Sequence, residues 1–193
     1  DMGATVVRSG EIYEQSVAAA VKAADDNGWS LLSDTSWDDY YAVPHVLMEG
    51  YCVLMHEIFA QIPQLPTHVF LQAGVGGLAG AAAAMARAKW GDAPQIIVVE
   101  PDFAPALMAS VKAGRAVVAD GPVSDMGRLD CKEPSLIALK GLCVDADIFM
   151  TISDNEALAA TSVLADHDLA ASTSGGAGLA AVLAGFALPA DAR

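Results

Sequence analysis

A glycine-rich stretch at residues 72–80, QAGVGGLAG, limits the folds that this chain can adopt more than any other feature of the sequence. It follows an apolar run at residues 67–73 and precedes an alanine-rich run at residues 78–89, which predicts a strand, a tight turn and a helix in succession. The next apolar run, residues 96–100, is continuous rather than alternating, as in strands that parallel sheets bury on both faces. The sequence therefore predicts an α/β fold with a largely parallel sheet.

The same alternation of strand and helix signals continues on both sides of this stretch. Further strands are predicted at residues 4–9, 29–33 and 147–152, and further helices at residues 13–24, 44–62, 105–112 and 134–142. Ser153 and Glu156 have the spacing of a capping box, and a last helix is expected after the glycines at 175, 176 and 178. Residues 121–132 have weak periodicity and are expected to form a loop, which in such folds often covers a site.

Charge and composition narrow the possible partners. Ten basic residues against 24 acidic ones give a formal net charge of -14, which repels a nucleic-acid backbone and an anionic membrane surface. The longest apolar run, residues 175–188, is too short and too rich in glycine to span a bilayer. With 54% hydrophobic and 18% charged residues, we expect a globular protein without a nucleic-acid or membrane partner.

The residue types that bind metals or form disulfides show no such pattern. Cys52, Cys131 and Cys143 are odd in number and lack CxxC spacing, so we expect reduced core residues in a cytoplasmic protein. The histidines are scattered and are expected to have structural roles: His45, His56, His68 and His167.

The glycine-rich stretch itself predicts an anion site. Glycines let the backbone approach a ligand, and the amides and dipole at a helix N-terminus attract negative charge. A Walker loop is excluded because no Gly-Lys-Ser/Thr follows. Two alternatives stay open: a tight turn without a ligand, and a dinucleotide site. In the second, Gly74, Gly76 and Ala79 fit G-x-G-x-x-A and Glu100 binds a ribose, although that fingerprint normally lies on the first strand of its domain.

Several segments in the same order resemble the diaminopropionate ammonia-lyase family. They are residues 33–37 (SDTSW) with Tyr40 and Pro44, residues 48–51 (MEGY), 66–69 (PTHV), 72–77 (QAGVGG), 99–101 (VEP) and 129–135 (LDCKEPS). The similarity covers nearly the whole chain, and SDTSW is more specific than the glycine-rich stretch. The resemblance implies the parallel-sheet sandwich of fold-type-II pyridoxal-phosphate enzymes, incomplete here at both ends. It also implies that residues 1–43 belong to the smaller lobe and residues 44–193 to the larger one.

The resemblance assigns roles to particular residues. Gly74, Val75, Gly76, Gly77 and Leu78 are implied to hold the phosphate of pyridoxal 5'-phosphate. Asp34 is implied to remove the α-proton of a small amino-acid substrate, 2,3-diaminopropionate, which then yields pyruvate and ammonia. From the residues alone, the polar neighbours Ser33, Thr35 and Ser36 favour a helix or turn cap for Asp34. Trp37 and Tyr40 are expected to pack rather than to contact the cofactor.

Other features of the family are expected to lie outside this chain. The lysine that holds the cofactor as a Schiff base is implied to precede residue 1, and the partner of the pyridine nitrogen to follow residue 193. This piece alone is therefore expected to be inactive, whereas the full-length protein is implied to be a homodimer. Lys22, Lys89, Lys112, Lys132 and Lys140 stand in no comparable context.

Residues 172–178, STSGGAG, resemble a second loop of the family, with Thr173 where a glutamate is common. Ser172 or Ser174 is expected to cap the last helix. Two alternative functions remain at this point: a threonine or serine dehydratase, which removes water by the same chemistry, and a nucleotide-binding module.

Overall fold

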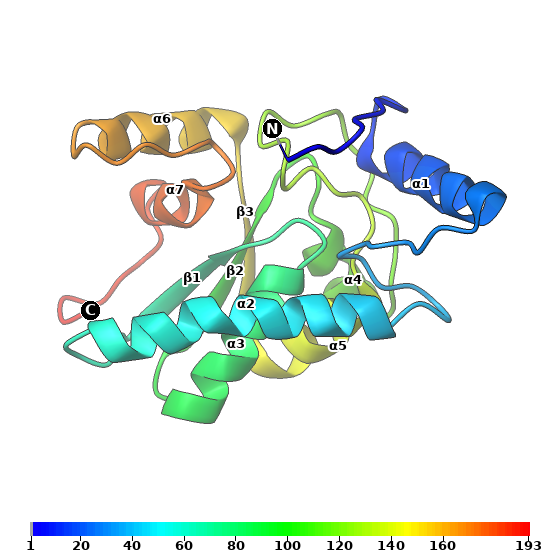
Figure 1. The fold of residues 1–193 in the computed structure, drawn as a ribbon. Helices are drawn as coiled ribbons and strands as arrows, with labels where there is room; N and C mark the ends of the chain where they lie inside the picture. Colours follow the sequence, from blue (N-terminus) through cyan, green and yellow to red (C-terminus); the bar gives the residue numbers. More distant parts are fainter. Residues whose placement is uncertain (1) are drawn as a thin grey trace.

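The computed structural model describes residues 2–193 and forms a layered α/β structure (Figure 1). Its elements in chain order are α1 (Tyr13–Asn27), α2 (Ala42–Gln61), β1 (His68–Gln72), α3 (Gly77–Trp90), β2 (Gln95–Pro101), α4 (Ala106–Ala113), α5 (Leu136–Asp145), β3 (Ile148–Ile152), α6 (Asp154–Ala165) and α7 (Ala177–Leu183). The strands form a parallel sheet in the order β1-β2-β3. This confirms the predicted α/β class and its parallel sheet.

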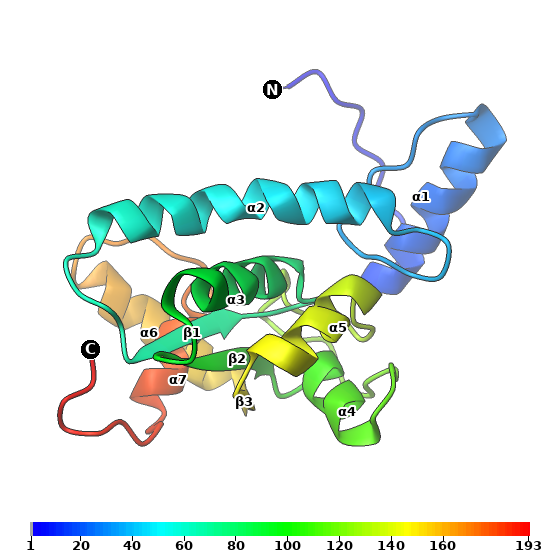
Figure 2. The same ribbon diagram turned by 90° about the horizontal axis from the view of Figure 1, so that it is seen from below.

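The sheet has a helical layer on each face. Figure 2 shows α2 and α3 stacked on one side of the strands and α7 on the other. Successive strands are added in one direction, so right-handed crossovers place their helices on the same face, and α3 and α5 accordingly pack against each other. The opposite face is covered by α6 and α7, which follow the last strand.

Strand β2 shows why its sequence is continuously apolar. Ile96 and Val98 point into a core shared with α3, whereas Ile97 and Val99 point into a second core shared with α6 and α7. All four side chains are fully buried. Burying both faces of one strand requires an unbroken apolar run, and the prediction for residues 96–100 is confirmed.

Of the elements predicted near the N-terminus, the strands at residues 4–9 and 29–33 are wrong and the helix between them is confirmed. Residues 4–9 and 29–33 are irregular, and Val6, Val7 and Leu32 are 83%, 79% and 76% exposed. A strand exists only through hydrogen bonds to a neighbour, and within residues 2–193 no segment pairs with either stretch. The helix between them forms because its pattern and its left-handed Gly28 stop are local signals.

The remaining predicted helices and strands are confirmed with small shifts of their ends, as are the capping box of Ser153 and Glu156 and the loop at 121–132. Of the cysteines, Cys131 is buried, Cys52 is partly buried and Cys143 is exposed, so the core prediction is wrong for Cys143. No helix within residues 2–193 has the length and apolar character needed to cross a membrane. In the same residues, no group of three or more His, Cys, Asp or Glu could hold a metal ion.

Candidate active site

The turn between β1 and α3 is open toward a ligand. Gly76 is the N-cap of α3 with φ 100°, and no side chain of the cap accepts a hydrogen bond from the first-turn amides. These amides therefore have no acceptor in the cap, and the helix dipole adds positive potential at the same place. The turn presents a site suited to an anion.

Two glycines of this turn are required by its surroundings. A Cβ at Gly76 would lie 3.0 Å from Leu107 Cδ1, and its positive φ is strained for any other residue. A Cβ at Gly74 would lie 3.1 Å from Arg128 O, Cys131 Sγ and Leu129 Cα. The turn therefore packs tightly against α4 at Gly76 and against residues 128–131 at Gly74.

A cavity of about 500 Å³ opens in front of the turn, and we call it the glycine-loop pocket. Its volume is within the range of small-molecule and cofactor sites. It is lined by Tyr13, Asp34, Tyr51, Gln72, Ala73, Gly74, Val75, Gly76, Gly77, Leu78, Ala79, Gly127, Arg128, Leu129, Cys131, Ser172, Ser174 and Gly175. Asp34 and the whole stretch Gly74 to Leu78 thus lie around one cavity.

Asp34 is oriented by a neighbouring phenol. Tyr13 of α1 donates a hydrogen bond of 2.7 Å to Asp34 Oδ1, and its hydroxyl also lies 2.7 Å from Thr35 Oγ1. The turn around Asp34 is capped by Ser33, whose Oγ accepts from Thr35 N at 3.2 Å. The carboxylate of Asp34 is therefore held at the pocket by side chains, and the capping role falls to Ser33.

Several residues that line the glycine-loop pocket were not predicted from the sequence to lie in the site. Arg128 is the single basic residue around the pocket in the described part of the chain. Tyr13 carries no local signal, because only the packing of α1 brings it to Asp34. Burial raises the pKa of Cys131 to about 12, so this thiol stays protonated and is not a nucleophile. The LDCKEPS segment was the available signal for Cys131.

The structure contradicts the ribose role of Glu100. This side chain is fully buried, and its two oxygens accept hydrogen bonds from Leu107 N at 2.7 Å and Met108 N at 2.8 Å. It therefore caps the start of α4 and does not line the glycine-loop pocket. Burial raises its pKa to about 7, against the opposing effect of the two amide bonds.

The expected serine cap of the last helix is also wrong. The N-cap of α7 is Gly176, without a side-chain hydrogen bond. Ser172 Oγ accepts from Gly175 N, and Ser174 Oγ accepts from Arg128 N at 3.2 Å. Both serines line the glycine-loop pocket, whereas Thr173 donates to Asp125 O and does not.

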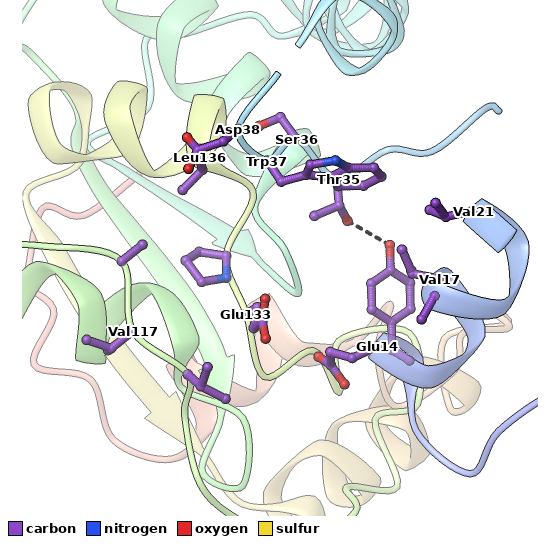
Figure 3. Close-up of a pocket in the computed structure, with 15 residues that line it drawn as sticks. Glu14, Val17, Val21, Thr35, Ser36, Trp37, Asp38, Val117, Glu133 and Leu136 are labelled. Carbon is purple, nitrogen blue, oxygen red and sulfur yellow. Dashed lines mark hydrogen bonds between the residues drawn. The ribbon is translucent and has the colours of Figure 1, made fainter. Parts of the chain in front are cut away.

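A second cavity has a volume of about 450 Å³, and Figure 3 shows residues that line it. Its walls are formed by α1, by residues 35–38 and 116–118, and by Glu133, Pro134 and Leu136, and they include the carboxylates of Glu14, Asp38 and Glu133. Tyr13 lines this second cavity as well as the glycine-loop pocket.

Comparison with known proteins agrees with this geometry. The family described as pyridoxal-phosphate dependent enzyme matches residues 1–191. The chain belongs to that family. The match confirms the expected enzyme class, and the cofactor of the family is pyridoxal phosphate.

Relatives within the family include diaminopropionate ammonia-lyases. The protein of that name from Salmonella typhimurium is 36% identical over 155 residues, which cover 74% of this chain and 37% of the relative. The Escherichia coli protein is 32% identical over 171 residues, covering 85% of this chain and 42% of the relative. The chain thus spans less than half the length of these relatives.

Solved structures confirm the fold. The Escherichia coli diaminopropionate ammonia-lyase in complex with an aminoacrylate-PLP azomethine reaction intermediate superimposes with a TM-score of 0.83 at 30% identity. The match covers 89% of this chain and 46% of that one. A threonine deaminase from T.th. reaches a TM-score of 0.81 at 22% identity, over 95% of this chain and 58% of the other, and shows the fold alone.

The described residues fit the phosphate end of the family's cofactor. The first-turn amides of α3 have no acceptor in the cap, and glycine at 74 and 76 keeps Cβ atoms out of the contacts around them. No lysine among residues 2–193 lines the pocket. Lys132 is held elsewhere, because its Nζ donates to Asp130 Oδ1 at 2.6 Å and to the carbonyls of Phe103 and Pro122.

Proposed function

We propose that this chain carries the phosphate-binding part of a pyridoxal-phosphate lyase that converts 2,3-diaminopropionate to pyruvate and ammonia. The observation that supports this most is the meeting of Asp34 and the stretch Gly74 to Leu78 around one cavity. Family membership supports the cofactor, and the named relatives support the substrate. On the resemblance alone we also propose that the full-length protein is a cytoplasmic homodimer, in which residues 1–43 are part of the smaller lobe and residues 44–193 belong to the larger one.

The glycine loop, residues 74–78, binds the cofactor phosphate in this proposal. Backbone amides at a helix start suit a compact dianion, and Arg128 adds the basic side chain of the pocket. A dinucleotide would need an acceptor for its ribose hydroxyls, and Glu100 is buried and engaged with α4. The loop therefore favours a phosphate group over a dinucleotide.

Asp34 acts as the base that takes the proton from the α-carbon of the substrate. When bound, the cofactor supplies an electron sink for the charge left on that carbon. Tyr13 donates a hydrogen bond of 2.7 Å to Asp34 Oδ1, which restrains the rotation of the carboxylate. The other oxygen, Oδ2, is then available to receive the proton. The electron pair left on the α-carbon forms the double bond to the β-carbon as the β-amine leaves as ammonia. Addition of one water to the released enamine then gives pyruvate and a second ammonia.

The test is a substrate comparison on the purified full-length protein loaded with pyridoxal phosphate. Ammonia and pyruvate release would be measured with 2,3-diaminopropionate, threonine and serine at equal concentrations. The proposal expects the highest kcat/KM for 2,3-diaminopropionate. A higher kcat/KM for threonine or serine would replace it with the dehydratase function, and no turnover of any of them would remove the lyase function.

A further inference from the structure

The segment that carries Asp34 and the glycine loop are joined by two buried serines. Ser36 and Ser135 are 1% and 0% exposed, and their hydroxyl oxygens lie 2.8 Å apart. Ser135 Oγ also accepts from Ser36 N at 3.0 Å. These residues are 99 positions apart in the sequence, and we call the pair the serine bridge.

The first half of the bridge attaches the Asp34 segment to the start of α5. Ser135 is the N-cap of α5, yet its own side chain makes no capping bond. Ser36 supplies the cap instead, because its Oγ accepts from Ile137 N at 2.8 Å and its carbonyl accepts from Leu136 N at 3.1 Å. Ser36 and Leu136 both line the second cavity, which Figure 3 shows. Asp34 lies two residues before Ser36.

The second half attaches α5 to the glycine loop. Ser135 N donates to Val75 O at 2.9 Å. In a planar trans peptide the carbonyl and the following N–H point in opposite directions, so this bond also directs the N–H of Gly76 away from Ser135. The bridge thus fixes one amide of the loop and the backbone beside Asp34 through the same residue.

We propose that Ser36 and Ser135 are positioning residues that couple occupancy of the glycine loop to the placement of Asp34. This inference rests on the proposed function and adds a route by which the loop and the base affect each other. The bridge is fully buried and made of short, mutually supporting hydrogen bonds, and such networks hold a single arrangement. An anion that orders the loop would then order residues 34–37 as well.

The test compares the full-length wild type with a Ser36→Ala/Ser135→Ala double variant. Ser110→Ala is the matched control, because Ser110 is also 1% exposed and its Oγ accepts from a backbone amide, Val117 N at 3.0 Å. Ser110 itself lines neither cavity, and its bond joins neither the Asp34 segment nor the glycine loop. Amide hydrogen exchange is measured with and without inorganic phosphate, a probe that occupies only the loop. Steady-state kinetics are measured on each enzyme loaded with pyridoxal phosphate.

In the wild type and in Ser110→Ala, phosphate is expected to slow exchange at residues 74–78 and also at 34–37. In the double variant, protection at 74–78 should remain, protection at 34–37 should disappear, and kcat should fall roughly 10- to 100-fold. If the double variant does not fold, Ser135→Ala alone is scored in the same way, since it keeps the bond between Ile137 N and Ser36 Oγ.

Phosphate-dependent protection of residues 34–37 that survives in the double variant would overturn the coupling. So would wild-type protection confined to 74–78, and in that case the proposed function would still stand. Equal losses of kcat in Ser110→Ala and in the double variant would show that the serine bridge only stabilises the fold, which would also overturn the coupling. An absence of wild-type protection at 74–78 would overturn the proposed function, and the coupling with it.

Discussion

The glycine loop, residues 74–78, is held by packed backbone, whereas the segment with Asp34, residues 33–37, is held by side-chain hydrogen bonds. On the loop side, Cβ atoms at Gly74 and Gly76 would meet neighbours at 3.0 to 3.1 Å. On the other side, Tyr13 and Ser135 provide the contacts. Substitutions in the loop should therefore change stability and cofactor binding, and those around Asp34 should change turnover.

The largest expected effect comes from Asp34→Asn in the full-length enzyme. Asparagine keeps the size of the side chain but cannot accept the α-proton, so kcat should fall about 10²- to 10⁴-fold with cofactor still bound. Kinetics with each enantiomer of 2,3-diaminopropionate and the cofactor absorbance would measure this, and we expect the loss chiefly for one enantiomer. Full activity toward both enantiomers would leave Asp34 with a structural role only.

The stability of the region around the glycine loop should depend on pH because of Glu100. Its pKa is raised from 4.5 to about 7 in the folded protein, so the folded state binds this proton more tightly than the unfolded one. Its contribution to the free energy of unfolding is thus complete below pH 4.5 and is lost as the pH rises toward about 7. The loss should amount to roughly 3 kcal/mol.

Urea unfolding of the wild type and of Glu100→Gln between pH 4.5 and 8 isolates this contribution by difference. Glu100 bonds Leu107 N, and the Leu107 side chain packs at Gly76, so α4 and the loop should weaken together. Identical pH profiles for the two proteins would show that Glu100 is ionised without cost in the folded state.

Gly76→Ala tests the backbone of the loop directly. At φ 100° with Leu107 Cδ1 3.0 Å from the new Cβ, alanine should lower the free energy of unfolding by about 1–3 kcal/mol and weaken phosphate binding. Gly50→Ala is the matched control, because Gly50 is in α2 with nothing within 4 Å of its Cβ position, and there alanine should be neutral or stabilising. Equal effects of the two substitutions would contradict a strained loop.

The smallest expected effect is that of Tyr13→Phe on the Asp34 side. The variant loses the 2.7 Å hydrogen bond to Asp34 Oδ1, and a bond worth about 1 kcal/mol corresponds to a fall in kcat of roughly fivefold. Tyr41→Phe makes the same chemical change at an exposed tyrosine that bonds Asp38, and it should leave kcat unchanged. A fall in cofactor affinity rather than in kcat would show that Tyr13 contributes to cofactor binding and not to the placement of Asp34.

The parts of the fold that the sequence predicted correctly depend on local signals. Strand β2, the start of α3 and the Ser153–Glu156 capping box are each encoded within a few neighbouring residues. The strands predicted at 4–9 and 29–33 failed because a strand needs a partner, and a sequence pattern does not supply one.

The residues of the candidate site also divide into those that a local sequence pattern indicates and those that only the tertiary structure brings to the cavity. Asp34 and the glycine loop belong to recognisable segments, and the structure places them around one cavity. Tyr13 and Arg128 reach that cavity only through the tertiary packing of a helix and a loop, so no local pattern indicates them. Ser174 belongs to the recognisable segment at residues 172–178, but that segment does not by itself show that Ser174 lines the cavity. The bond between Ser36 and Ser135 spans 99 positions and is likewise invisible in either segment alone.

Calorimetric titration of the full-length protein with pyridoxal phosphate, inorganic phosphate and NAD tests most directly whether the glycine loop is a phosphate site of the pyridoxal-phosphate type. Pyridoxal phosphate should bind, inorganic phosphate should compete with it, NAD should not bind, and Gly76→Ala should weaken both phosphate ligands. Preferential binding of NAD that is lost in Glu100→Ala would contradict the assignment and restore the dinucleotide site.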